Sequence, residues 1–223
     1  PKIIKAGKYK DIGSPARDMT KKVGLSTIAD VPAPAVIVLG ERPGAWPDLL
    51  RVEKLVHKLR RDEQVSLAFQ AVNRDKQSVL DQFEDAKLRQ TDLPSLLDWA
   101  AHWTMPFDHY QPLIAMAELD VQLIAAGSDV ELRPADARVP LPPGYIHILM
   151  DAVGENPLPV QTESTFVQTM AWRDYNIANT AIQQWNGEGY LIILADRLHV
   201  EGNKGVQWQA ARLTEHPVQA VLL

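Results

Sequence analysis

Four polar side chains that suit acid–base chemistry or ligand binding stand just after short apolar runs of the sequence. They are Glu41, Gln70, Asp196 and His199. If the apolar runs are parallel strands, their carboxyl ends lie along one edge of the sheet, where open sheets bind ligands. We therefore expect these side chains, although far apart in sequence, to converge at that edge. Two carboxylates and an imidazole there would act as a general acid and base or would bind a divalent cation.

Each of these residues also has an ordinary structural interpretation. His199 is a catalytic or ligating histidine in one interpretation and a hydrogen-bonded histidine at a strand end in the other. Glu41 carries function, caps the following helix or pairs with Arg42. Asp174, next to Arg173, is interpreted as half of an ion pair that ties a long helix to the sheet rather than as a catalytic group.

The elements that must position these groups alternate between apolar runs and amphipathic stretches, as in a parallel sheet covered by helices. The expected strands are 35–39, 65–69, 121–125, 145–149, 190–194 and 218–222. The expected helices are 49–59, 75–87, 93–103, 108–119 and 162–185. Continuous apolar runs such as 35–39 are typical of strands that are buried on both faces. The sequence predicts a three-layer α/β fold with a mainly parallel sheet flanked by helices.

The chain is expected to form one domain over residues 1–223. The helical stretch after the second strand is too long for one crossover, so residues 72–112 are predicted to form a small helical insertion. Residues 1–24 form a basic arm of net charge +5, whereas the remainder carries −10. An acidic body argues against a nucleic-acid partner. The arm is interpreted as a solvated leader, with a membrane-proximal tether as the alternative.

Composition excludes several classes of site. The sequence contains no cysteine, which excludes disulfides, thiolate metal sites, iron–sulfur clusters and cysteine nucleophiles. No apolar run approaches the roughly 20 residues that a transmembrane helix needs. No signal peptide is recognisable at the start of the sequence, and an export signal removed before Pro1 stays an open alternative.

Several motifs occur in an order and spacing that resemble one protein family. The motifs are Gly40-Glu41 after the first strand, Tyr110-Gln111-Pro112-Leu113, Arg173-Asp174 in the long helix, and His199-Val200 with Gly205-Val206 near the C terminus. Together they resemble the ChaN family, haem-binding and iron-regulated lipoproteins of the bacterial envelope, within the wider Tiki and erythromycin-esterase-like superfamily. The resemblance runs in register from about residue 35 to the C terminus.

The sequence departs from the family pattern where the superfamily is proposed to bind metal or to hydrolyse. The family usually has Gly-Glu-x-His after the first strand, and Pro43 stands in place of that histidine. Gln70 replaces the usual glutamate after the second strand, and Asp196 replaces a glycine before the later histidine. Of the proposed set, Glu41 and His199 remain. The resemblance therefore implies a degenerate site and favours a protein without catalytic activity.

The resemblance implies haem as a cofactor, held by a tyrosine, with basic groups on its propionates, in a pocket shared by two subunits. A tyrosinate ligand needs a partly exposed phenol and a nearby cation that lowers its pKa. Among five tyrosines, Tyr145 follows a proline-rich loop and Tyr175 follows Arg173, and both are candidates. The other residues expected to bind the cofactor are Glu41, Arg42, Gln70, Asp196, Arg197 and His199. His102 and His109, which flank an aromatic stretch, either contact haem or pack the helical segment.

Three functions follow as hypotheses. The first is a non-catalytic ChaN-like protein that binds haem or a similar flat hydrophobic ligand in iron or haem uptake. It would be a homodimer on the periplasmic side of the outer membrane, tethered through a lipidated N terminus that precedes this chain. The second is a metal-dependent hydrolase with Glu41, Asp196 and His199 as ligands or acid–base groups. The third is an interaction module without ligand or activity, in which a partner covers an exposed apolar patch between Trp99 and Phe107.

Overall fold

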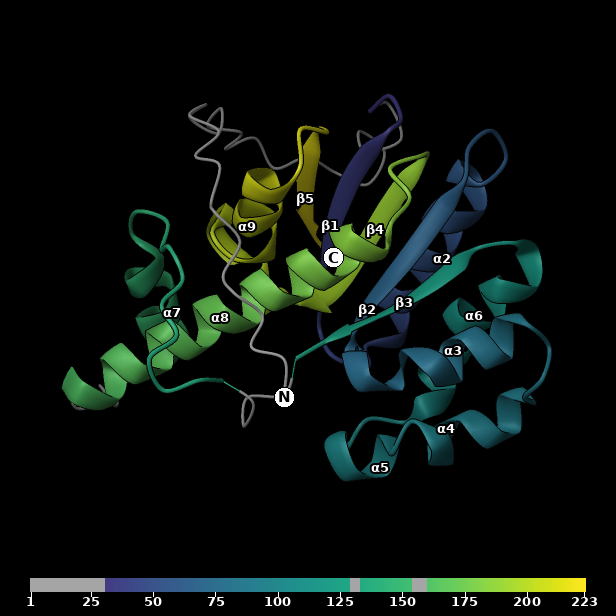
Figure 1. Ribbon diagram of the computed structural model, residues 1–223, viewed down its shortest axis with the longest axis horizontal. Coiled ribbons are helices and arrows are strands. Elements are labelled where there is room, and N and C mark those ends of the chain that lie inside the picture. Colours follow the sequence, from purple (N-terminus) through teal and green to yellow (C-terminus); the bar gives the residue numbers. More distant parts are fainter. Residues whose placement is uncertain (1–30, 129–132, 154–159) are drawn as a thin grey trace.

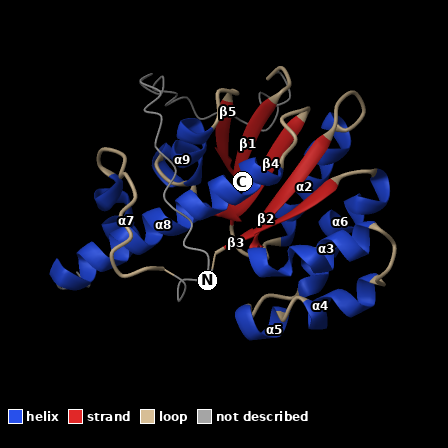
Figure 2. Cartoon of the chain, in the orientation of Figure 1, coloured by secondary structure: helices blue, strands red, loops and turns tan. Residues whose placement is uncertain are grey.

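The computed structural model describes residues 31–128, 133–153 and 160–223, and within them five strands form one sheet. The strands are β1 (Ala35–Glu41), β2 (Val65–Asn73), β3 (Gln122–Gly127), β4 (Tyr190–Asp196) and β5 (Val218–Leu222). Their order is β3-β2-β4-β1-β5, and every neighbouring pair is parallel. Helices cover both faces (Figure 1; Figure 2), so the predicted α/β fold with a parallel sheet is confirmed.

The central strands are apolar on both faces because helices bury both sides. In β1, Ile37 and Leu39 belong to one core cluster, whereas Val36 and Val38 belong to the other. Side chains of a strand alternate between faces, so one continuous apolar run supplies both cores. The last residue of β1, Glu41, continues the odd-numbered positions and therefore faces the first of these cores.

The helices divide between the two faces (Figure 1). The first core is covered by α2 (Trp46–Leu59), α3 (Gln77–Glu84), α4 (Leu93–Leu96), α5 (Trp99–His102) and α6 (Gln111–Ile114). The second is covered by α8 (Val160–Gln184) and α9 (Val206–Leu213), while α7 (Tyr145–Val153) packs against α8. The predicted helices 49–59 and 162–185 correspond to α2 and α8. Among the described residues, no helix has the length and apolarity needed to span a membrane.

The predicted strand 145–149 is wrong, because this segment is the first part of α7. The sequence alternates between Ile and other residues there, which imitates the period of a strand. In the helix, Tyr145 and Leu149 are one turn apart and both are buried against α8, whereas Ile146 is exposed. The backbone N–H of Tyr145 donates to the carbonyl of Pro142, so the helix begins directly after the proline-rich loop.

The two long helices predicted at 93–103 and 108–119 are also wrong, since each is broken into short pieces. Between β2 and β3 the chain also forms the 3-10 turns η1 (Arg74–Lys76), η2 (Gln90–Asp92), η3 (Phe107–His109) and η4 (Ala115–Leu119). Asp98 adopts a left-handed conformation with φ of 52° and separates α4 from α5. Pro112 lacks an N–H group and lies in the first turn of α6. The boundaries of the helical insertion and the single-domain organisation stay predictions.

Candidate active and ligand-binding site

The carboxyl edge of the sheet brings together three of the four residues chosen from the sequence, Glu41, Gln70 and Asp196, whereas His199 lies on the other face. Glu41 at the end of β1 lies opposite Asp196 at the end of β4 in the parallel register. The backbone N–H of Asp196 donates to Gln70 Oε1 at 2.8 Å. His199 follows in the 3-10 turn η6 (Arg197–His199), whose start is capped because Asp196 Oδ1 accepts from the backbone N–H of Leu198 at 2.8 Å. The strand ends therefore meet at one edge, as the parallel pattern predicted.

Glu41 is buried in the first core with an incomplete set of partners. It is 3% exposed, and Tyr110, between η3 and α6, donates its hydroxyl to Glu41 Oε1 at 2.5 Å. Oε2 is buried and has no hydrogen-bond partner among the described residues. Burial raises the pKa of the Glu41 carboxyl to about 8; the Tyr110 hydrogen bond opposes this rise, and the charges of Asp196 and Asp48 add to it. Glu41 is therefore mostly a neutral acid at neutral pH.

Arg42 is anchored to a fully buried carboxylate. Asp48, in the first turn of α2, accepts from Arg42 Nη2 at 2.7 Å and from Nε at 2.9 Å, and Arg51 Nη1 lies 3.3 Å away. The hydrogen bonds from Arg42 are the largest cause holding the pKa of Asp48 below its usual value. Both arginine side chains remain about half exposed. The surface here presents guanidinium groups while their counter-charge lies in the interior.

His199 belongs to a separate buried cluster on the other face of the sheet. Its Nδ1 lies 2.6 Å from Asp174 Oδ1 of α8, and the Tyr145 hydroxyl of α7 donates to Asp174 Oδ2. All three side chains are at most 3% exposed. Gly205 permits the turn that follows, because a Cβ at this position would lie 1.8 Å from the carbonyl oxygen of His199. Sequence reasoning missed Asp174 as the partner of His199.

The structure does not gather Glu41, Asp196 and His199 into one set of ligands. Nδ1 of His199 is used by Asp174, and Oε1 of Glu41 is used by Tyr110, on opposite faces. Across residues 31–128, 133–153 and 160–223, no group of three or more His, Asp or Glu side chains is placed to hold a metal ion. Arg197 is partly buried, and its Nη2 lies 3.9 Å from Glu201 Oε1.

The two tyrosines predicted to hold haem differ in exposure. Tyr145 is 2% exposed, and burial followed by the charge of Asp174 raises its pKa above the ordinary range. It therefore lacks the exposed, acidified phenol that a tyrosinate ligand requires. Tyr175 is half-buried on α8, beside the core of α7 and α8.

The aromatic stretch near α5 packs the core rather than forming an exposed patch. Trp99 and Phe107 are buried, with ring centroids 5.2 Å apart, and Trp99 also contacts Tyr110 at 5.1 Å. The Trp103 indole donates to the carbonyl of Ala71 at 2.8 Å. The expectation of an exposed apolar patch between Trp99 and Phe107 is therefore wrong.

His109 is half-buried, and its imidazole is held by one hydrogen bond. Its Nδ1 lies 2.7 Å from the carbonyl oxygen of Gly44, in the turn between β1 and α2. The exposed indole of Trp46 at the start of α2 lies beside it, with ring centroids 5.8 Å apart. From the sequence, His109 stood out only beside the aromatic stretch, and nothing pointed to Trp46. No sequence spacing links positions 46 and 109, so only the fold brings them together.

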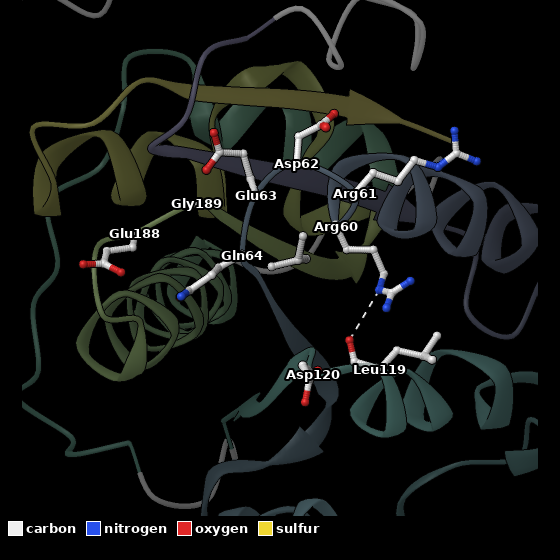
Figure 3. Close-up of a pocket in the computed structure, with 10 residues that line it drawn as sticks. Arg60, Arg61, Asp62, Glu63, Gln64, Leu119, Asp120, Glu188 and Gly189 are labelled. Carbon is white, nitrogen blue, oxygen red and sulfur yellow. Dashed lines mark hydrogen bonds between the residues drawn. The ribbon is translucent and has the colours of Figure 1, made fainter.

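A hollow of about 480 Å³ lies at the opposite, amino edge of the sheet (Figure 3). Its rim mixes charges of both signs, including Arg60, Asp62, Glu63 and Glu188. None of the residues selected from the sequence lines it.

Comparisons with solved structures support the fold. The chain is similar to ChaN of Campylobacter jejuni, described as binding haem cofacially, with 15% identity, a TM-score of 0.67, and coverage of 84% of this chain and 80% of that one. The type III effector HopBA1 matches at 9% identity and a TM-score of 0.58, over 88% and 78% of the two chains. RRSP, a toxin effector domain from Vibrio vulnificus, matches at 14% identity and a TM-score of 0.52, over 89% of this chain and 36% of that chain.

Sequence comparison finds one family model that matches part of the chain. No curated protein matches the chain. The model of the family described as haem-binding uptake, Tiki superfamily, ChaN matches residues 27–135, a segment that contains Glu41, His109 and Tyr110. The later motifs around Asp174 and His199 lie outside the matched residues. Over residues 27–135, the chain is therefore similar to the ChaN family of the Tiki superfamily.

Proposed function

We propose that this chain is a haem-binding protein without catalytic activity. The family match over residues 27–135 carries the proposal, since that family is described as haem-binding and as serving uptake. The matched segment contains β1, the turn at Gly44 and the η3 segment, which lie together in the fold.

Haem requires an axial nitrogen or oxygen donor, an apolar surface for the macrocycle and cations for the propionates. The described residues offer an imidazole whose Nδ1 is anchored, an exposed indole beside it and arginines held at the surface. This donor set fits haem. When bound, haem would supply an iron centre that accepts such a ligand, while the protein residues orient the ring and bind its carboxylates.

The altered acidic set supports a non-catalytic function. Pro43 stands where the family has a histidine, and Gln70 accepts a backbone hydrogen bond from Asp196. Glu41 is neutral at physiological pH because burial raises its pKa to about 8. A neutral acid, an amide and a proline bind cations weakly.

We also propose the cellular setting implied by the family. The protein would act in iron or haem uptake at the bacterial envelope, as a homodimer, through a lipidated segment that precedes this chain. Light scattering with and without haemin tests the dimer. Membrane fractionation of cells that express the full-length gene tests the anchor, and recovery of the protein in the soluble cytoplasmic fraction contradicts it.

Titration with haemin tests the main proposal. We expect a saturable Soret band with a fixed stoichiometry and a shift from the spectrum of free haemin. A bovine serum albumin blank corrects for nonspecific haemin uptake. A linear, non-saturating response at all concentrations would show that the chain does not bind haem.

A second candidate, hydrolysis, is favoured by the contact between Asp174 and His199. The carboxyl group orients the imidazole through Nδ1, as in acid–base catalysis. Elemental analysis and hydrolysis of an activated ester test this candidate. If the chain is a hydrolase, the wild type should show activity or a stoichiometric divalent metal, and His199→Ala should lose it. His57→Ala, which changes a partly exposed histidine on α2, should keep it.

A further inference from the structure

We infer that His109 is the axial haem ligand of this chain, with Trp46 beneath the macrocycle and Arg42 at the propionates. This inference rests on the proposed haem binding and places its site at the turn between β1 and α2. It replaces the tyrosine ligand that the family resemblance implies.

The backbone around His109 is fixed by its neighbours. Phe107 and Tyr110 are both buried, and both rings contact Trp99. The backbone N–H of His109 donates to the carbonyl of Pro106 at 3.3 Å. An axial ligand on such a segment needs little reorganisation before it binds iron, which preserves affinity.

The imidazole is also oriented. Nδ1–H donates to the Gly44 carbonyl at 2.7 Å, which leaves the lone pair on Nε2. No hydrogen bond among the described residues uses Nε2. Ligating histidines ordinarily donate their other N–H to a carbonyl or carboxylate, which fixes the tautomer. The Gly44 turn is held from its other side, because its N–H donates to the Tyr110 hydroxyl at 3.3 Å.

Trp46 and Arg42, near His109, suit a flat ligand that carries negative charge. Trp46 is 41% exposed although it is large and apolar, and its ring lies 5.8 Å from that of His109. Arg42, four residues before Trp46, keeps its exposed guanidinium fixed on the buried Asp48. The turn between β1 and α2 therefore carries Arg42 and Trp46, and its Gly44 carbonyl holds the imidazole of His109.

The experiment compares His109→Asn with His57→Asn in the otherwise unchanged chain. The asparagine amide occupies nearly the position of Nδ1 and preserves the donor to Gly44, but it removes Nε2. His57 lies on α2 with a partly exposed side chain and provides the matched control. We expect His109→Asn to weaken haemin binding by about tenfold or more, to change the Soret maximum and the electron paramagnetic resonance spectrum, and to recover them partly with added imidazole. The control should bind as the wild type does.

Metal-free protoporphyrin IX distinguishes binding through the iron from binding through the macrocycle. It has no axial bond to lose, so wild type and His109→Asn should bind it alike, whereas Trp46→Ala should weaken both porphyrins. If wild type binds haemin and His109→Asn binds it equally with the same spectrum, the ligand assignment is wrong and the proposed function stands. Loss of both porphyrins in His109→Asn also overturns the assignment, because the histidine then maintains the surface. If wild type binds no haemin, the proposed function fails and this inference with it.

Discussion

At the carboxyl edge, each face of the sheet has one buried carboxyl group that accepts a hydrogen bond from a tyrosine. The two carboxyl groups differ in how many of their oxygens have partners. On the α8 face, Asp174 accepts from both His199 and Tyr145, so both oxygens are used. On the α2 face, Glu41 receives one hydrogen bond from Tyr110, and its second oxygen has no partner among the described residues. The negative charges of Asp196 and Asp48 lie near Glu41, and burial is the main cause of its raised pKa.

The Asp174 network is structural and enclosed, whereas the Glu41 network extends to the surface. The Asp174 cluster joins α7, α8 and η6 and is enclosed. The Glu41 cluster continues through Tyr110 to the N–H of Gly44, whose carbonyl accepts from His109. A change at Asp174 should therefore affect stability most, whereas a change on the other face should also affect ligand binding.

The largest expected effect comes from Asp174→Ala. The substitution leaves the His199 N–H and the Tyr145 hydroxyl buried without their acceptor, and removal of one partner from such a network costs about 4 kcal/mol. Urea unfolding followed by circular dichroism measures this loss. The control Glu163→Ala changes a partly exposed residue in the first turn of α8. A loss below about 1 kcal/mol would show that the enclosed network contributes little.

The next effect concerns the pH dependence of stability. The pKa of Glu41 is about 8 in the folded chain against 4.5 as its ordinary value, so the folded state binds more protons between these values. The contribution of Glu41 to the free energy of unfolding is therefore highest at the acidic end of this window and falls as pH rises through it, by about 3 kcal/mol between pH 5 and pH 8.

The matched variant for this prediction is Glu41→Gln, which has no titrating proton. Its stability should change with pH by about 3 kcal/mol less than that of the wild type, as measured by urea unfolding at several pH values. Parallel curves for the two proteins would mean that Glu41 ionises normally.

Two glycines extend the comparison to the backbone. In Gly205→Ala, the new Cβ would lie 1.8 Å from the carbonyl oxygen of His199, a backbone contact that no rotamer relieves. We expect a loss of about 2–3 kcal/mol in the free energy of unfolding. Gly44 has φ of +70°, so Gly44→Ala should cost about 1–2 kcal/mol. If the haem site is as inferred, Gly44→Ala also weakens haemin binding and Gly205→Ala does not, and the reverse pattern contradicts the separation of the two faces.

Much of the fold could be predicted from the sequence, because strands buried on both faces produce continuous apolar runs that are visible locally. The convergence of Glu41, Gln70 and Asp196 followed from parallel strand direction alone. Segment 145–149 was predicted wrongly, since a short run of alternating apolar residues fits a strand and a buried helix equally well.

The side-chain partners could not be predicted in the same way. The contacts between Asp174 and His199 and between His109 and Gly44 join positions 25 and 65 residues apart. They depend on the direction in which each side chain leaves its element and on the exact ends of the short helices between β2 and β3. The left-handed conformation of Asp98, together with Pro106 and Pro112, sets those helix ends. The prediction of two long helices failed in this segment.

The smallest effect distinguishes the two tyrosines. Tyr145→Phe removes one donor from Asp174 and should cost about 1–2 kcal/mol. Tyr110→Phe should cost about 1 kcal/mol at pH 5, and its effect should change with pH, because the Tyr110 hydrogen bond lowers the pKa of Glu41. Without that bond, the alkaline limit of the Glu41 window should move upward in unfolding curves of Tyr110→Phe. Identical pH profiles for Tyr110→Phe and the wild type would show that the Tyr110 hydrogen bond does not change the ionisation of Glu41.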